Sequence, residues 1–204
     1  MLALTEYSKF LIGLLAIVDP LGAVAMLVGL TASRTHDVRR LIARHTVLWV
    51  FVILSLSLLA GKYLLLLFGI SIHSFRVAGG LLLLLMGIQM LMAGNERPGN
   101  GELDTALALV PMSMPLLAGP GAISAVIVYA HRGEGPAHIA MVWLVIAVVC
   151  LTLALVFRLL PWFMRHLTPA RVNVSTRLMG VLLASIAVEF IANGLRGLFP
   201  VLAG

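Results

Sequence analysis

Six long apolar segments dominate the sequence and leave little chain between them. They run near residues 8–30, 41–67, 74–93, 106–130, 137–163 and 175–195. A helix needs about 20 apolar residues to cross the hydrocarbon of a bilayer, and every segment is long enough. Only 11% of the residues are charged, whereas a soluble domain carries about 25%. The sequence therefore predicts an all-α integral membrane protein with six transmembrane helices.

Proline and glycine interrupt two of these segments. The first contains Asp19-Pro20-Leu21-Gly22, and the fourth contains Gly119-Pro120-Gly121-Ala122. Proline removes a backbone donor and clashes with the preceding turn, so the first and fourth helices are predicted to be broken. A broken helix at membrane depth is tolerated only where it is buried in protein or lines a wet cavity. Paired breaks of this kind indicate the binding site of a transporter.

The two halves of the chain resemble each other. The third segment reads SFRVAGGLLLLLMGIQMLMAG from Ser74, and the sixth reads STRLMGVLLASIAVEFIANG from Ser175. Each half has three spans, an odd number, so the halves must lie in opposite orientations. We expect a first repeat over 1–94, a connecting loop over 95–104 and an inverted second repeat over 105–204, together one membrane domain. The pair Gly79-Gly80 is expected to allow close approach of helices.

Basic residues predict the orientation of the chain in the membrane. Nine of the 14 lie near the first, third and fifth links: Arg34, Arg39, Arg40, Arg44, Arg97, Arg158, Arg165, Arg171 and Arg177. The side with more Lys and Arg faces the cytoplasm. Both termini are therefore expected outside. Because the basic residues cluster at helix ends, the net charge of +6 does not indicate nucleic-acid binding.

Each break ends one half-helix and begins another. The free amides at a helix start favour a carboxylate, and the free carbonyls at a helix end favour an ammonium group. Two facing breaks therefore suit a small zwitterion, although the amides would also suit an inorganic anion. The predicted substrate-binding residues are Asp19, Pro20, Gly22, Ala23, Ser113, Gly119, Pro120, Gly121, Ala122, Ile123 and Ser124.

Two acids within the apolar segments are candidates for proton coupling. Asp19 suits a counter-ion for a substrate amine or a proton carrier, and it also suits the N-cap of a helix that begins at Pro20. Glu189 is expected to be buried, either as a proton carrier or in a neutral hydrogen bond between helices. Gln89 and Asn193 are expected to form hydrogen bonds between helices.

Several classes of function lack support in the sequence. The single cysteine, Cys150, and six scattered histidines show no metal-ligand spacing, and no nucleotide loop or catalytic triad is present. We therefore expect no cofactor, no metal and no enzymatic activity. The expected partners are membrane lipid and a small zwitterionic substrate. The oligomeric state stays open, a homo-oligomer included.

With both breaks located, the chain resembles the MarC family, which includes small neutral amino acid transporters of the SnatA type. The resemblance is carried by PLLAGPGAIS at 115–124, with DPLG at 19–22 and FRVAGG at 75–80 in support. It covers nearly the whole length and implies six spans in two inverted halves within a bacterial or archaeal plasma membrane. The family commonly has Asn at the position of Ala23, and a PLAIP sequence where this chain has VPMSMP at 110–115.

Together these patterns predict a secondary transporter with its site between the two broken helices. The family resemblance implies glycine-like and alanine-like substrates, moved by export or exchange, with a proton as the candidate coupling ion. One rival hypothesis is a transporter of another small solute, such as a drug, an anion or a cation. Another is a membrane scaffold that transports nothing.

Overall fold

The computed structural model of the chain describes residues 4–31, 35–92, 117–133, 135–159, 169–199 and 201. Within these ranges the helices are α1 (Leu4–Val18), α2 (Pro20–Leu30), α3 (His36–Leu67), α4 (Ile72–Met92), α6 (Pro120–Ala130), α7 (Pro136–Arg158) and α9 (Pro169–Leu198). No strand occurs among the described residues. The predicted all-α class is confirmed for this part of the chain.

Five helical stretches are long and apolar enough to cross a membrane. They are Leu4–Val24, Asp37–Leu67, Ile72–Met92, Pro136–Arg158 and Thr176–Leu198. A further apolar helix, Pro120–Ala130, is shorter. It forms the end of the predicted span 106–130, of which residues 106–116 lie outside the described ranges. The chain thus has the helices of a multi-pass membrane protein.

Two helices begin earlier than predicted. α3 starts at His36 rather than near residue 41, and α9 starts at Pro169 rather than near residue 175. Thr35 has the extended backbone of an N-cap, and Asp37 lies in the first turn of α3, where the helix dipole favours negative charge. Hydropathy marks only where the apolar stretch begins. It therefore misses polar turns that continue a helix beyond the hydrocarbon.

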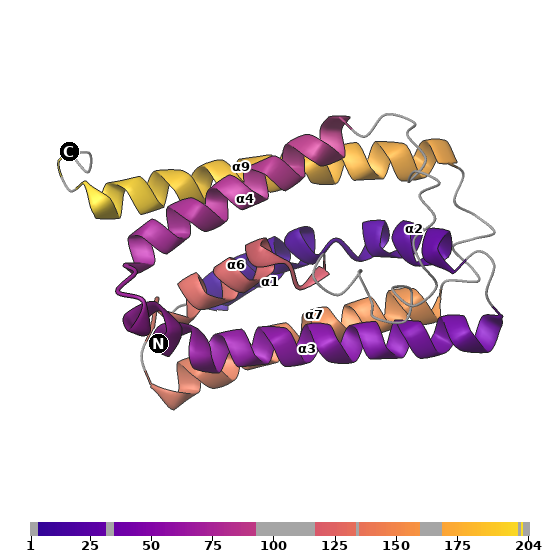
Figure 1. The fold of residues 1–204 in the computed structure, drawn as a ribbon, viewed down its shortest axis with the longest axis horizontal. Coiled ribbons are helices and arrows are strands. Elements are labelled where there is room, and N and C mark those ends of the chain that lie inside the picture. Colours follow the sequence, from indigo (N-terminus) through magenta and orange to yellow (C-terminus); the bar gives the residue numbers. More distant parts are fainter. Residues whose placement is uncertain are drawn as a thin grey trace.

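The helices are arranged in three layers (Figure 1). α4 and α9 lie together on one side, α1, α2 and α6 form the middle, and α3 and α7 lie on the other side. The first residues of α1 and the last residues of α9 lie at the same end of the molecule. We refer to it as the terminal end of the bundle.

Small residues let α4 and α9 pack closely. A Cβ atom built on Gly80 would lie 3.0 Å from the carbonyl oxygen of Ala187. One built on Gly180 would lie 3.0 Å from the carbonyl oxygen of Gly87. Contacts that bring backbones together are typical of small-residue interfaces between membrane helices. The expectation that Gly80 allows close approach is confirmed.

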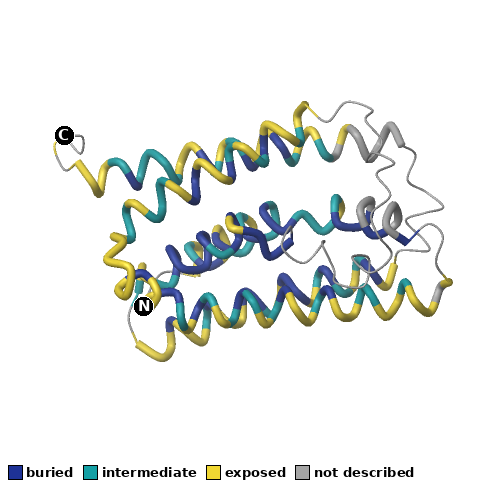
Figure 2. Tube along the Cα trace, in the orientation of Figure 1, coloured by how far each residue is buried: buried dark blue, intermediate teal, exposed yellow. Residues whose placement is uncertain are grey.

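α6 is the most enclosed helix of the described chain. Each residue from Ala125 to Tyr129 is at most 5% exposed. The helix packs against α1, α3, α4 and α7, so neighbours surround it, and Figure 2 shows its buried residues in the middle layer. A helix that is apolar on every side can face lipid or other helices, and α6 faces other helices. The centre of the bundle is therefore built around α6.

Arg39 fastens α2 to the start of α3. Its Nε donates to Oγ1 of Thr31 at 2.9 Å, and its Nη2 donates to the carbonyl oxygen of Thr31 at 2.9 Å. Thr31 is the fully buried C-cap of α2, and a cation is favoured at a helix C-terminus. Arg39 therefore stabilises the contact between α2 and α3, in addition to being one of the basic residues that predict the orientation of the chain.

Candidate functional site

The junction between α1 and α2 consists of the single residue Asp19. Its φ of 43° and ψ of 74° place it in the left-handed region, which aspartate tolerates better than most residues. Its amide donates to the carbonyl oxygen of Leu15 at 3.0 Å, and its carbonyl oxygen accepts from the amide of Ala23 at 3.0 Å. Pro20 occupies the first position of α2, where its missing N–H costs nothing.

The carboxylate of Asp19 lies at the start of α2. It sits beside the amides of Leu21 and Gly22, without the geometry of a full capping hydrogen bond. A Cβ atom on Gly22 would collide with Oδ2 of Asp19, so only glycine leaves room for the carboxylate here. The positive end of the α2 dipole is therefore occupied by a negative group of the protein itself.

The second junction lies at Gly119, directly before α6. Gly119 has extended backbone, with φ of −67° and ψ of 176°, and Pro120 begins the helix. The amide of Ile123 donates to the carbonyl oxygen of Gly119 at 3.1 Å. Unlike Asp19, the cap residue here has no side chain. At the start of α2 the cap residue supplies a carboxylate, whereas the cap residue of α6 supplies none.

The two junctions meet inside the bundle. A Cβ atom on Gly121 would lie 3.7 Å from Cγ2 of Ile17, two residues before Asp19. The 11 residues of α6 rise about 16 Å, roughly half of the ~30 Å hydrocarbon thickness. α6 runs from its junction toward the terminal end, so its start lies inside the bundle (Figure 1).

The predicted amide donors differ in their surroundings. The amides of Ala23 and Ile123 already bond to the cap residue that precedes each proline. Those of Gly22, Gly121 and Ala122 lie in the first turns, ahead of these bonds. The amide of Gly22 faces the carboxylate of Asp19. Of the predicted donors, Gly121 and Ala122 are therefore the ones placed to bind a ligand through the backbone.

The remaining predicted site residues are spread around the second junction. Pro120 is exposed, whereas Gly119, Gly121 and Ala122 are buried. Gly121 packs against Leu83 of α4, where a Cβ atom would collide with Cδ2. Ser124 is 3% exposed and packs against Gly79, so it lies in the contact between α6 and α4. Ser113 lies outside the described residues.

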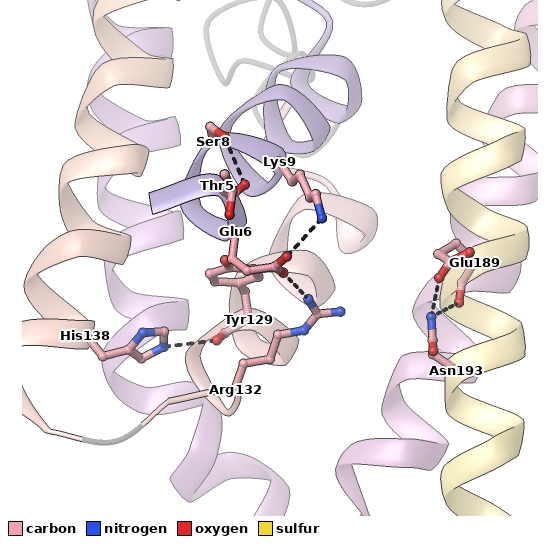
Figure 3. Close-up of polar contacts among 9 residues, drawn as sticks. All are labelled: Thr5, Glu6, Ser8, Lys9, Tyr129, Arg132, His138, Glu189 and Asn193. Atoms are coloured by element: carbon pink, nitrogen blue, oxygen red, sulfur yellow. Dashed lines mark hydrogen bonds and ion pairs between the residues drawn. The ribbon is translucent and has the colours of Figure 1, made fainter. Parts of the chain in front are cut away.

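Glu189 is not buried, contrary to the expectation from sequence. It lies on the exposed side of α9, as does Gln89 on α4. The buried side of α9 is formed instead by Leu183 and Ala187, together with the glycine contacts to α4. The amide nitrogen of Asn193 donates to Oε1 of Glu189 at 2.7 Å, a bond within one helix (Figure 3). A role for Glu189 in proton coupling stays a prediction.

A buried aromatic cluster, which we name the terminal plug, joins α1, α6 and α7. It consists of Tyr7, Phe10, Tyr129 and His138, each at most 8% exposed. The rings of Phe10 and Tyr129 are stacked with centroids 4.0 Å apart, and Tyr7 meets Tyr129 edge to face at 6.0 Å. His138 bonds to the hydroxyl of Tyr7 at 2.7 Å and to the carbonyl oxygen of Tyr129 at 3.1 Å.

Charged residues lie beside Tyr129 of the terminal plug (Figure 3). Arg132 lies 5.3 Å from the ring centroid of Tyr129 and 3.6 Å from Glu6. Lys9 donates to Glu6 at 3.0 Å. The plug closes α1 against α6 between the junctions and the terminal end. Polar residues near the ends of three predicted spans were the only sequence signal for it.

No group of three or more His, Cys, Asp or Glu residues in the described part of the chain is placed to hold a metal ion. The site is therefore characterised by helix ends, one carboxylate and small residues. Such a set can bind a charged or dipolar solute.

Comparison with known proteins identifies the family. The description "MarC family integral membrane protein" matches residues 4–199. The membrane protein YhcE of Escherichia coli K12, of group UPF0056, is 37% identical over 95% of this chain and 94% of its own length. A UPF0056 membrane protein of Pyrococcus abyssi is 33% identical over 97% of this chain and 98% of its own.

YvbG of Bacillus subtilis, also a UPF0056 membrane protein, is 35% identical over 94% of each chain. No solved structure matches the chain. The relatives come from bacteria and archaea and match almost from end to end. The chain therefore belongs to the MarC family of integral membrane proteins.

Proposed function

We propose that this protein is a secondary transporter of small neutral amino acids, with its site where the α1/α2 and Gly119/α6 junctions meet. The observation that carries the proposal is the contact between the end of α1, at Ile17, and the start of α6, at Gly121, next to both junctions. Secondary transporters recurrently bind their substrates at such discontinuities. We further propose six spans, of which the first and fourth are broken.

The difference between the junctions suggests how a zwitterion binds. At α2 the carboxylate of Asp19 already occupies the helix start. At α6 the amides of Gly121 and Ala122 follow a cap without a side chain, so this end suits the substrate carboxylate. Asp19 then serves as the counter-ion of the substrate ammonium group or as the proton site. Glycine and alanine are small, which suits a site where Leu83 and Ile17 pack closely around Gly121.

The contacts between α4 and α9 support inverted repeats. If each residue of α4 is matched to the residue 100 positions later, the contact of Gly80 with Ala187 becomes a contact of Gly180 with Gly87. Both contacts occur. A two-fold axis that exchanges the halves produces such pairs. We therefore propose that the halves are related by this axis, with both termini outside the plasma membrane.

The terminal plug fits a transporter that opens to one side at a time. It lies between the junctions and the terminal end. On the other side, Pro120 and Leu21 are exposed at the junctions. We propose that this conformation is closed toward the outside. Transport then requires α1 and α6 to separate at Phe10 and Tyr129.

Flux in proteoliposomes tests the function. Labelled glycine, alanine, larger amino acids and non-amino-acid solutes are compared with and without a pH gradient. We expect saturable flux of glycine and alanine. Flux of only a drug or an inorganic ion would favour the rival transporter, and no flux above protein-free vesicles for any solute would favour a scaffold.

A further inference from the structure

The exposed side of α9 carries residues spaced alternately by four and three. These residues, which we name the α9 seam, are Leu178, Leu182, Ser185, Glu189 and Ala192. The first four are exposed and Ala192 is partly buried. An average spacing of 3.5 residues keeps one face of a helix in continuous contact with a second helix. None of the described helices covers this face.

Glu189 is out of place on a surface that faces lipid. It lies 13 residues after Thr176 and nine before Leu198, the ends of the membrane-length stretch of α9. This position is near the middle of the hydrocarbon, where an ionisable side chain is strongly disfavoured unless it finds a partner. The bond to Asn193, one turn later on the same helix, satisfies only one oxygen of the carboxyl group.

The atoms left over on Glu189 and Asn193 complement each other. Asn193 uses its amide nitrogen for both of its bonds to Glu189, one to the carbonyl oxygen and one to Oε1. Among the described residues, Oε2 of Glu189 and Oδ1 of Asn193 have no partner. A neutral carboxyl group donates from one oxygen, and an amide oxygen accepts. The existing bonds use neither Oε2 of Glu189 nor Oδ1 of Asn193, so both atoms are open to a second helix.

We propose that two copies of this chain associate side by side in the membrane through the α9 seam, with Glu189 of each copy bonded to Asn193 of the other. Copies insert in one orientation, so the two α9 helices run parallel and a two-fold axis makes the bonds reciprocal. Ser185 and Ala192 are small and let the backbones approach. This association is independent of the proposed transport function.

Gln89 explains why the interface is assigned to α9 and not to α4. It is exposed at the matching position of α4, but only three residues before the helix ends at Met92. A side chain so close to a helix end can reach the polar interface. Gln89 therefore does not require a protein partner. It is a matched control for Glu189.

Disulfide trapping tests the contact directly. In a Cys150→Ser background, Ser185→Cys in native membranes is expected to form a cross-linked dimer under mild oxidation. Leu151→Cys, at an exposed position of α7 near mid-membrane, is the control and is expected to stay monomeric. Absence of the dimer at position 185, or equal cross-linking at 151, overturns the proposal.

Energy transfer between labelled copies in dilute liposomes tests the bonds. Glu189→Leu combined with Asn193→Leu is expected to weaken association at least about tenfold, whereas Gln89→Leu changes it less than about twofold. Glu189→Gln keeps a hydrogen-bond donor at this position and is expected to retain the dimer. If it does, the weaker association of the double variant results from the lost bonds and not from a general folding defect. A monomeric parent, or a double variant that associates like the parent, overturns the proposal.

Discussion

The hydroxyl of Tyr7 lies 2.7 Å from Nδ1 of His138, although 131 residues separate them in the chain. Nε2 of the same ring lies 3.1 Å from the carbonyl oxygen of Tyr129, which can only accept a hydrogen bond. In the neutral imidazole, Nε2 then carries the proton and Nδ1 accepts from the tyrosine. One imidazole thus ties α1, α6 and α7 together at the terminal end.

Tyr7→Phe should destabilise the protein without changing its shape. The substitution leaves Nδ1 of His138 buried without a donor, a loss of about 1–3 kcal/mol in the free energy of unfolding. Thermal unfolding in detergent measures this loss. Tyr63→Phe is the control because Tyr63 is 71% exposed, and it should unfold with the parent. Equal stability of the two variants would contradict the hydrogen bond.

Asp19→Asn and Asp19→Ala should separate the backbone role of Asp19 from its charge. Asparagine tolerates the left-handed backbone at φ of 43°, whereas alanine is strained there by about 1–2 kcal/mol. We expect the asparagine variant to fold but to lose the pH dependence of amino acid flux. The alanine variant should also lose stability. Unchanged pH dependence in Asp19→Asn would remove Asp19 as the proton site.

Gly121→Val should impair folding rather than binding alone. From sequence, this glycine is expected to leave space for a substrate, so valine should spare the fold. The structure instead packs Leu83 against it, and overpacking costs about 1–3 kcal/mol. We expect Gly121→Ala to be destabilising and Leu83→Ala to restore part of that loss in the double variant. If the double variant loses as much thermal stability as the two single variants together, the contact is absent.

Gly87→Ala and Gly13→Ala provide a matched pair of substitutions within helices. A Cβ atom on Gly87 would lie 2.9 Å from backbone atoms of Gly180 and Ala184, so α4 and α9 must move apart. A Cβ atom on Gly13 meets nothing within 4 Å. We expect Gly87→Ala to lower the unfolding temperature and Gly13→Ala to leave it unchanged or to stabilise the helix by about 0.5–1 kcal/mol.

Topology can be tested with impermeant thiol labels in intact cells. On a Cys150→Ala background, Thr35→Cys should stay unlabelled and Ser71→Cys should react. Both positions are exposed and lie at opposite ends of α3. The bias of Arg and Lys predicts that position 35 lies in the cytoplasm. Labelling of position 35 alone would reverse the orientation.

The sequence predicts the helices better than it predicts their faces. Apolar length locates α4 and α7 within a few residues, and proline with glycine locates the starts of α2 and α6. Glu189 was expected to be buried because a span that is apolar on all sides does not distinguish the lipid from the core. Only the packing of α9 on α4 decides which side is exposed.

Long-range contacts between unlike residues were not predictable. Tyr7 and His138 each look like an ordinary polar residue near the end of a span, and no local pattern links them. The role of Leu83 at Gly121 depends on α4 crossing α6, which no spacing in the sequence reveals. The two proline junctions were found because proline and glycine act on their own backbone.

The half-length of α6 has an electrical consequence. At the proposed site, a ligand at the start of α6 would lie about halfway through the membrane. Each net charge that it brings would then cross about half of the transmembrane voltage, about 1.1 kcal/mol per 100 mV. A zwitterion has no net charge and reaches this depth without work against the field. Any voltage dependence of amino acid flux would therefore report the charge of the protons or other ions that move with the substrate, because the substrate itself carries no net charge.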